Sequence, residues 1–322
     1  MRRHGDDCRH DHAVVAHDRR SALLTLAGVE ARRTWRGAAL WIGLPLSVLF
    51  GWNTSEADWS GGNYSSLVLM LVPLAGAAFV AGVRSAGKDV RADVPPLGED
   101  AALGDRERSL ARLLGLAPFL MVTLVGTAVL EIAIRIEGGM WMGDHPGRTD
   151  SAVHTLPELL QPAMLVVVAA TAGVAAGRRF RHRLPIIALG VVVTFMNTGP
   201  YWVFQWVPMT YVTLVQTQPI EEYAGPRSTD PATFPAGWLL HRPDQYNGSW
   251  RHVTVDQLLA GGHVVYFVGL ATLFVAAIVR GREGRRLVLL AFGVIAAGLL
   301  IQLVATDFAF TISGTSPGQV YD

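Results

Sequence analysis

Seven long apolar segments, separated by short charged runs, constrain this 322-residue chain more than any other feature of its sequence. Each segment is near the length of roughly 17 to 25 residues that a helix needs to cross a hydrocarbon core. Hydrophobic residues make up 51% of the chain and charged residues only 16%, which argues against a soluble domain. The pattern predicts an all-α, polytopic membrane helix bundle with about seven transmembrane helices. The segments centre on Leu44, Val72, Val122, Val168, Val192, Leu270 and Ile295.

A helix-forming segment with a basic end, residues 21–36, precedes the first apolar segment. Helical spacing predicts a polar side and an apolar side for it, as in a helix that rests on the headgroup layer. The two sides are Thr25, Arg32 and Arg36, and Ala22, Leu26 and Val29. We predict an interfacial elbow helix, with an ordinary elbow of no special role as the alternative. Residues 1–20 lack periodicity and are predicted to be a disordered cytoplasmic tail before a transmembrane domain at 21–322.

Basic residues fall mostly on one side of the predicted topology. With the N-terminus inside, 22 of the 27 Lys and Arg residues lie on the inner side. Cytoplasmic loops of membrane proteins carry such an excess. The distribution therefore predicts a multi-pass plasma-membrane protein with a cytoplasmic N-terminus, and seven spans would place the C-terminal tail outside.

Two connecting segments are long enough to carry function. Residues 84–112 form the predicted inner loop, and its second half reads as a short charged helix with Arg108 and Arg112 on one face. Residues 208–257 form the predicted outer loop, which contains several Trp and Tyr residues among Pro and Gly. Those aromatic residues favour a packed external cap over a flexible linker.

Several function classes have little support in the sequence. Residues 82–88, GVRSAGK, resemble a phosphate-binding loop, but Asp89 replaces the Ser or Thr that binds magnesium, and an apolar helix precedes the glycine. No HExxH zinc motif or nucleophile elbow is present, so we predict no catalytic residues, no metal site and no enzyme activity of the chain itself. A net charge of +1 gives nucleic-acid binding no support.

Polar residues inside the apolar segments are candidates for a pathway or gate, because each is costly at membrane depth. The fifth segment contains Asn197, Gly199, Pro200 and Gln205, and Pro200 predicts a break in the helix. Broken helices often line a cavity, although a purely structural kink is the alternative.

A charged pair and a glycine motif add to these candidates. Glu131 and Arg135 lie four residues apart near the outer end of the third segment and are predicted to pair on one helix face, with a pathway role or simple mutual neutralisation as the alternatives. Gly173 and Gly177 form a small-xxx-small pattern, which predicts a close helix contact.

Two stretches resemble a known family. LLTLAGVEARRTWRGAALWIGLPLS is similar to the N-terminal elbow and first helix of ABC-2 type transporter permeases, the membrane subunits of ATP-binding-cassette exporters. RADVPPLGEDAALGDRERSLARLLGLAPF resembles the cytoplasmic connection between their second and third spans, which contacts the ATPase.

The resemblance implies a division of labour between subunits. This chain would export a substrate while an ABC ATPase, supplied in trans, binds ATP and Mg²⁺, and two permeases would form a homodimer or heterodimer in the lipid membrane. The family usually has six spans with both termini inside, whereas this sequence predicts seven. A membrane scaffold or sensor whose external loop binds a partner is the alternative. The resemblance assigns ATPase coupling to Glu30, Arg32, Arg33, Arg36, Arg106, Arg108 and Arg112.

Overall fold

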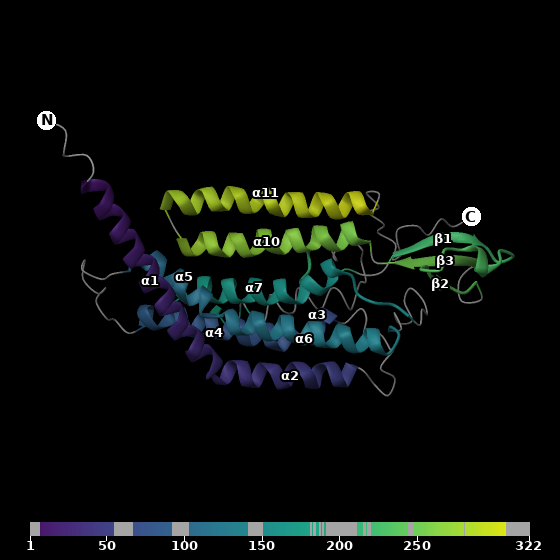
Figure 1. Cartoon of the computed structure of the whole chain (residues 1–322), viewed down its shortest axis with the longest axis horizontal. Coiled ribbons are helices and arrows are strands. Elements are labelled where there is room, and N and C mark those ends of the chain that lie inside the picture. Colours follow the sequence, from purple (N-terminus) through teal and green to yellow (C-terminus); the bar gives the residue numbers. More distant parts are fainter. Residues whose placement is uncertain are drawn as a thin grey trace.

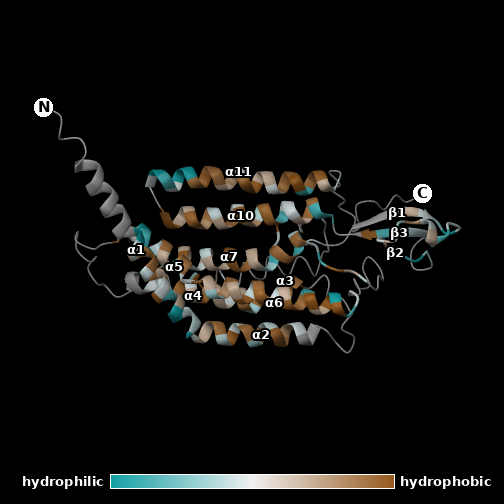
Figure 2. Cartoon of the chain, viewed as in Figure 1, coloured by the Kyte–Doolittle hydropathy of each residue, from teal (hydrophilic) through white to brown (hydrophobic). Residues whose placement is uncertain are grey.

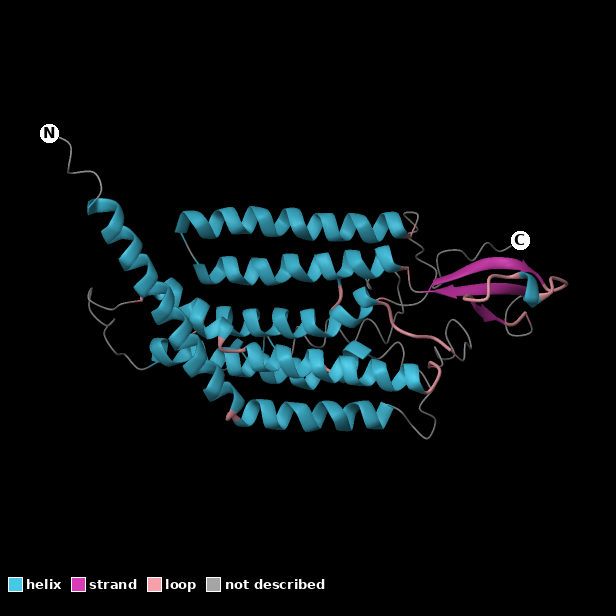
Figure 3. Cartoon of the chain, viewed as in Figure 1, coloured by secondary structure: helices cyan, strands magenta, loops and turns pink. Residues whose placement is uncertain are grey.

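A bundle of long helices with a small β-sheet at one end makes up the computed structural model (Figures 1 and 3). The structure describes residues 7–54, 67–91, 103–140, 151–180, 211–214, 220–243, 248–254, 256–279 and 281–306, together with residues 182, 185, 186, 188, 190 and 217. Helices α11, α10, α7, α4 and α2 pack side by side in that order, and α6 packs on α7.

The N-terminal helix α1, Asp7–Trp35, crosses one end of the bundle obliquely (Figure 1). A turn at Arg36 and Gly37 separates it from α2, Ala38–Thr54. The helix also includes most of the segment that we predicted to be disordered. No Gly or Pro lies between Asp7 and Ala27, so nothing in that stretch interrupts a helix.

Helices α4, Val72–Arg91, and α7, Leu156–Arg179, make a close contact through glycines. A Cβ atom added at Gly173 would lie 2.3 Å from the Phe79 carbonyl oxygen, and one at Gly177 would lie 2.8 Å from the Val83 carbonyl oxygen. Only glycine permits such an approach of two backbones. The small-xxx-small prediction is therefore confirmed, and Gly82 of α4 meets α7 in the same way.

The charged helix α5, Asp105–Leu114, leads into the apolar helix α6, Ala117–Ile136, through a short turn at Gly115 and Leu116. Glu107 caps the start of α5, because its Oε2 accepts the Gly104 N–H at 2.7 Å. The predicted short helix in the inner loop is thus present. The preceding helix α4 ends only at Arg91, so the first part of the predicted loop is helical too.

Helices α10, Gln257–Val279, and α11, Gly281–Ala305, form an antiparallel hairpin. Gly281 makes the tight turn possible, since its φ of 69° lies in the left-handed region that favours glycine. Gly269 and Gly298 then let the two helices approach: a Cβ atom at Gly298 would lie 2.5 Å from the Tyr266 nitrogen.

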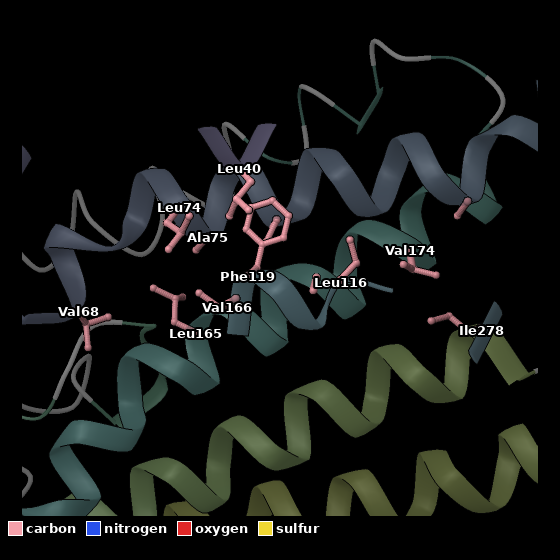
Figure 4. Packing of buried hydrophobic residues seen from close by; sticks show 13 residues of the cluster. Leu40, Val68, Leu74, Ala75, Leu116, Phe119, Leu165, Val166, Val174 and Ile278 are labelled. Carbon is pink, nitrogen blue, oxygen red and sulfur yellow. The ribbon is translucent and has the colours of Figure 1, made fainter. Parts of the chain in front are cut away.

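A buried apolar cluster joins the helices of the bundle (Figure 4). Phe119 of α6 and Leu74 of α4 are fully buried there, beside Leu40 of α2 and Val174 of α7. Val68 comes from the one-turn helix α3, Leu67–Met70. A hydrogen bond supplements this packing: the buried Ser47 hydroxyl accepts the Leu74 N–H at 3.0 Å.

Three antiparallel strands in the order β1-β3-β2 form the sheet: β1 is Ile220–Pro226, β2 is Leu239–His241 and β3 is Ser249–Thr254. A 3₁₀ helix, η2, spans Pro231–Thr233. The sheet packs on the bundle through Val253, which is buried with Ile134 of α6 and Ala260 of α10. The prediction of a packed segment did not include strands.

Four helices are long and apolar enough to cross a membrane within the described residues: Arg106–Ile136, Leu156–Arg179, Gln257–Val279 and Gly281–Ala305. Ala38–Gly51 and Val72–Gly87 are shorter apolar helices. Figure 2 shows the apolar residues concentrated along these helices and the polar residues at their ends. The chain is therefore a mostly helical, membrane-embedded protein, and most of the predicted fifth span lies outside the described residues.

Candidate functional site: an arginine-rich bundle end

The two segments that the resemblance assigns to ATPase coupling meet at one end of the bundle. Helix α1 packs against α5, and Glu30 lies at the turn that joins α5 to α6. A Cβ atom added at Gly115 would lie only 2.4 Å from the Glu30 Cβ, so the two backbones are in direct contact. The Arg33 guanidinium donates a hydrogen bond to the Glu30 carboxylate at 2.8 Å.

Helix α5 is tied to two other helices at this end. Arg106 pairs with Glu283 of α11, and both side chains remain about half exposed. Arg178, in the last turn of α7, donates to the buried Ser109 hydroxyl. A displacement of α5 would therefore act on α7 and on the α10–α11 hairpin. The remaining coupling candidates on α5, Arg108 and Arg112, are partly buried.

The elbow arginines face outward. Arg32, Arg33 and Arg36 are exposed and line a hollow together with Val29. The prediction that Val29 lies on the opposite side from Arg32 and Arg36 is wrong. Val29 precedes Arg32 by three residues and Arg36 by seven, and at 100° per residue these positions share one face.

Arginine side chains gather at this end of the bundle, away from the sheet. This end contains the last turn of α1, the whole of α5, the last turn of α7 and the first turns of α11 (Figures 1 and 2). The corresponding residues are Arg32, Arg33, Arg106, Arg108, Arg112, Arg178, Arg179, Arg282, Arg285 and Arg286.

A second polar group lies near the sheet. Glu131 is 5% exposed, and its carboxylate meets the Arg135 Nε at 2.7 Å and the His154 Nδ1 at 3.0 Å. Arg135 also donates to the His154 carbonyl oxygen at 3.1 Å. The predicted pairing of Glu131 with Arg135 is confirmed, but the buried partner His154 was not predicted. It lies two residues before α7, and no local spacing connects it to α6.

Further buried polar side chains join helices near the same end. Gln161 of α7 bonds both the backbone N–H and the hydroxyl of Thr217, at 3.1 and 3.0 Å. His263 of α10 contacts Gln302 of α11 at 3.0 Å, and Gln302 donates to the Tyr211 carbonyl oxygen at 3.3 Å. The His263 contact is the interhelical hydrogen bond expected of a histidine inside a helix bundle. These bonds fasten Thr217 to α7 and Tyr211 to α11.

The sheet contains a histidine with a perturbed proton affinity. His241 of β2 lies beside Arg251 of β3 in the strand register, and both are buried. Burial, and then the positive charge of Arg251, lower the pKa of His241 below the ordinary 6.5. The neutral imidazole is therefore the form that the folded sheet favours.

Other predicted features have simple outcomes. Gly82 and Gly87 both lie inside α4, so the stretch that resembles a phosphate-binding loop is helical. Among the described residues, no group of three or more His, Cys, Asp and Glu side chains could hold a metal ion. The proposed gate residues Asn197, Gly199, Pro200 and Gln205 lie outside the described residues.

Comparisons with models of protein families, with curated proteins and with solved structures find no match to this chain.

Proposed function

We propose that this chain is a permease-like subunit of an ABC-2 type transporter that exports a substrate with the energy of ATP hydrolysed by a separate subunit. The observation that carries the proposal is that α1 packs against α5, with Glu30 against Gly115 in the turn that follows α5. These segments are far apart in sequence, and the resemblance assigns both to the ATPase contact.

The contacts at this end suit the transmission of a movement of α5 to the other helices. Helix α5 continues almost directly into the membrane-length helix α6, so a partner that displaces α5 also displaces α6. The link from Arg106 to Glu283 and the bond from Arg178 to Ser109 would spread that displacement to α11 and α7. In this proposal the arginine-rich end faces the cytoplasm, in agreement with the positive-inside rule.

Charge reversal tests the ATPase contact. The triple variant R106E/R108E/R112E is expected to lose co-purification with an ABC ATPase, because the partner would meet three negative side chains in place of positive ones. The matched control is R282E/R285E/R286E, which reverses three arginines of α11 at the same end. Size-exclusion profiles establish that both variants fold. Survival of binding in the first variant and after deletion of residues 92–102 contradicts the contact.

A second candidate function uses the opposite end. A scaffold or sensor would bind its partner through the sheet, where Trp238 stacks on His252 with ring centroids 4.3 Å apart and remains 37% exposed. ATP-dependent flux in vesicles that contain both subunits separates the two functions. A transporter requires the ATPase for flux, whereas a scaffold gives no flux and loses its partner when Trp238 is replaced by Ala.

A further inference from the structure

A basic hollow lies where α1 bends into α2. Its lining consists of Val29, Arg32, Arg33 and Arg36, which occupy one side of the last turns of α1 and the bend itself. Three arginines and the apolar side chain of Val29 therefore border one open hollow. This geometry favours an anion with an apolar part.

The charge of the hollow is only partly neutralised. Arg33 pairs with Glu30 at 2.8 Å, and the Arg33 side chain remains 60% exposed. Within the part of the chain that the structure describes, Arg32 and Arg36 form no side-chain ion pair. Both side chains are exposed, and the planar fork of arginine matches the oxygens of a phosphate.

Two tryptophans indicate the depth of the hollow in the membrane. Trp35 and Trp41 pack edge to face with ring centroids 5.9 Å apart, and the Trp41 indole N–H donates to the Trp35 carbonyl oxygen at 2.7 Å. Both rings are about half exposed, at 47% and 52%. Tryptophan is enriched at the level of the lipid headgroups. The pair and the apolar helix that starts at Ala38 place the hollow at that level.

Helix α2, which follows the hollow in the chain, exposes apolar side chains along its length. Ile42, Leu46 and Leu49 are each about half exposed or more and follow Trp41 along the helix. A ligand bound at the arginines could lay an acyl chain along these side chains. A free phosphate would make only the polar half of these contacts.

We propose that this hollow binds the headgroup phosphate of an anionic phospholipid, with its acyl chains along α2. The phosphate would accept hydrogen bonds from Arg32 and Arg36. A zwitterionic lipid is disfavoured, because its ammonium group would meet three arginines. Arg32, Arg33 and Arg36 are also residues that the resemblance assigns to the ATPase contact, so lipid binding is tested on the purified chain without an ATPase.

The test titrates the purified full chain in a neutral detergent with dioctanoyl-phosphatidylglycerol and counts bound lipid by native mass spectrometry. Dioctanoyl-phosphatidylcholine is the zwitterionic comparison, and glycerol 3-phosphate is the free phosphate. A juxtamembrane arginine typically contributes roughly a fivefold gain in affinity for an anionic lipid. We therefore expect R32Q/R36Q to bind phosphatidylglycerol about 25-fold more weakly than the parent chain.

The matched control is R285Q/R286Q, which removes two exposed arginines from α11 at the same bundle end and is expected to bind as the parent does. Equal weakening in both double variants, or none in R32Q/R36Q, overturns the proposal. So does equal affinity for phosphatidylcholine, or competition by glycerol 3-phosphate at the lipid's own concentration.

A charge-preserving variant distinguishes the loss of charge in R32Q/R36Q from other effects of replacing the two arginines. R32K/R36K keeps both charges in the hollow and is expected to bind phosphatidylglycerol at least about fivefold more tightly than R32Q/R36Q. Equal affinity of the Lys and Gln variants contradicts an anionic ligand at these positions.

Discussion

Near the sheet, the polar side chains of the bundle are buried and bonded to one another, whereas at the arginine-rich end most of them are exposed. Glu131, His154 and Gln161 are buried, and each contacts a polar group of another segment. Arg32, Arg33 and Arg106 are exposed. Polar and charged groups therefore have two roles. Buried groups near the sheet hold segments together, and exposed arginines at the other end are available for a ligand or partner.

The largest effect is expected from Glu131→Ala, because it leaves the buried His154 and the neighbouring Arg135 without their carboxylate. Removing one member of such a group costs about 3 kcal/mol of unfolding free energy. Unfolding in mixed detergent micelles measures it. Glu137→Ala, which removes an exposed carboxylate at the end of the same helix, is the control and should have little effect. Similar losses in both variants would remove the distinction between the two ends.

Gly173→Ala is expected to destabilise the protein by about 2 kcal/mol, because the new methyl group would overlap the Phe79 carbonyl oxygen. The same unfolding measurement checks it. Gly76→Ala is the matched control, since it lies in α4 with no atom near its added Cβ. That change should be neutral or stabilising, because alanine favours a helix over glycine. An unchanged stability in Gly173→Ala would contradict the close contact of α4 with α7.

The sheet is expected to lose stability in acid, by a smaller amount. The folded chain holds the pKa of His241 below 6.5, so the unfolded chain takes up the proton first as the pH falls. The contribution of neutral His241 is therefore complete above about pH 6.5 and declines as the pH falls toward the folded-state pKa. Unfolding midpoints at a series of pH values measure it, and His241→Gln should flatten this part of the profile.

The smallest effect is expected at the ion pair between Arg106 and Glu283. Both side chains are about half exposed, and surface pairs of this kind contribute only about 0.5 kcal/mol. A double-mutant cycle with R106A and E283A measures the coupling. A value as large as that expected for Glu131 would mean that this end is also held together by charge, and that α5 is less accessible than we propose.

Local patterns predicted most of the helical architecture. Six of the seven apolar segments correspond to described helices, because long apolar runs have few other structures open to them in a membrane. The helix at α5 and the pairing of Glu131 with Arg135 also follow from spacing within one segment. The predicted contact at Gly173 required only that small residues permit a close approach.

Contacts between distant segments could not be predicted in the same way. His154 reaches Glu131 across the connection between α6 and α7, and Gln161 reaches Thr217 across more than fifty residues. Neither pair leaves a signature within a single helix turn. The strand Ser249–Thr254 did carry a signal, since its aromatic and β-branched residues favour a strand, but the surrounding Pro and Gly residues suggested only an irregular cap.

The seat of Val253 between α6 and α10 has a mechanical consequence. Val253 of the central strand and the partly buried Leu239 of β2 share an apolar cluster with residues of α6 and α10, two helices long and apolar enough to cross a membrane. A tilt of the sheet would therefore disturb the packing of these helices. A rigid antibody fragment bound to β1 and β2 is therefore expected to change the packing of α6 and α10 at the end of the bundle next to the sheet.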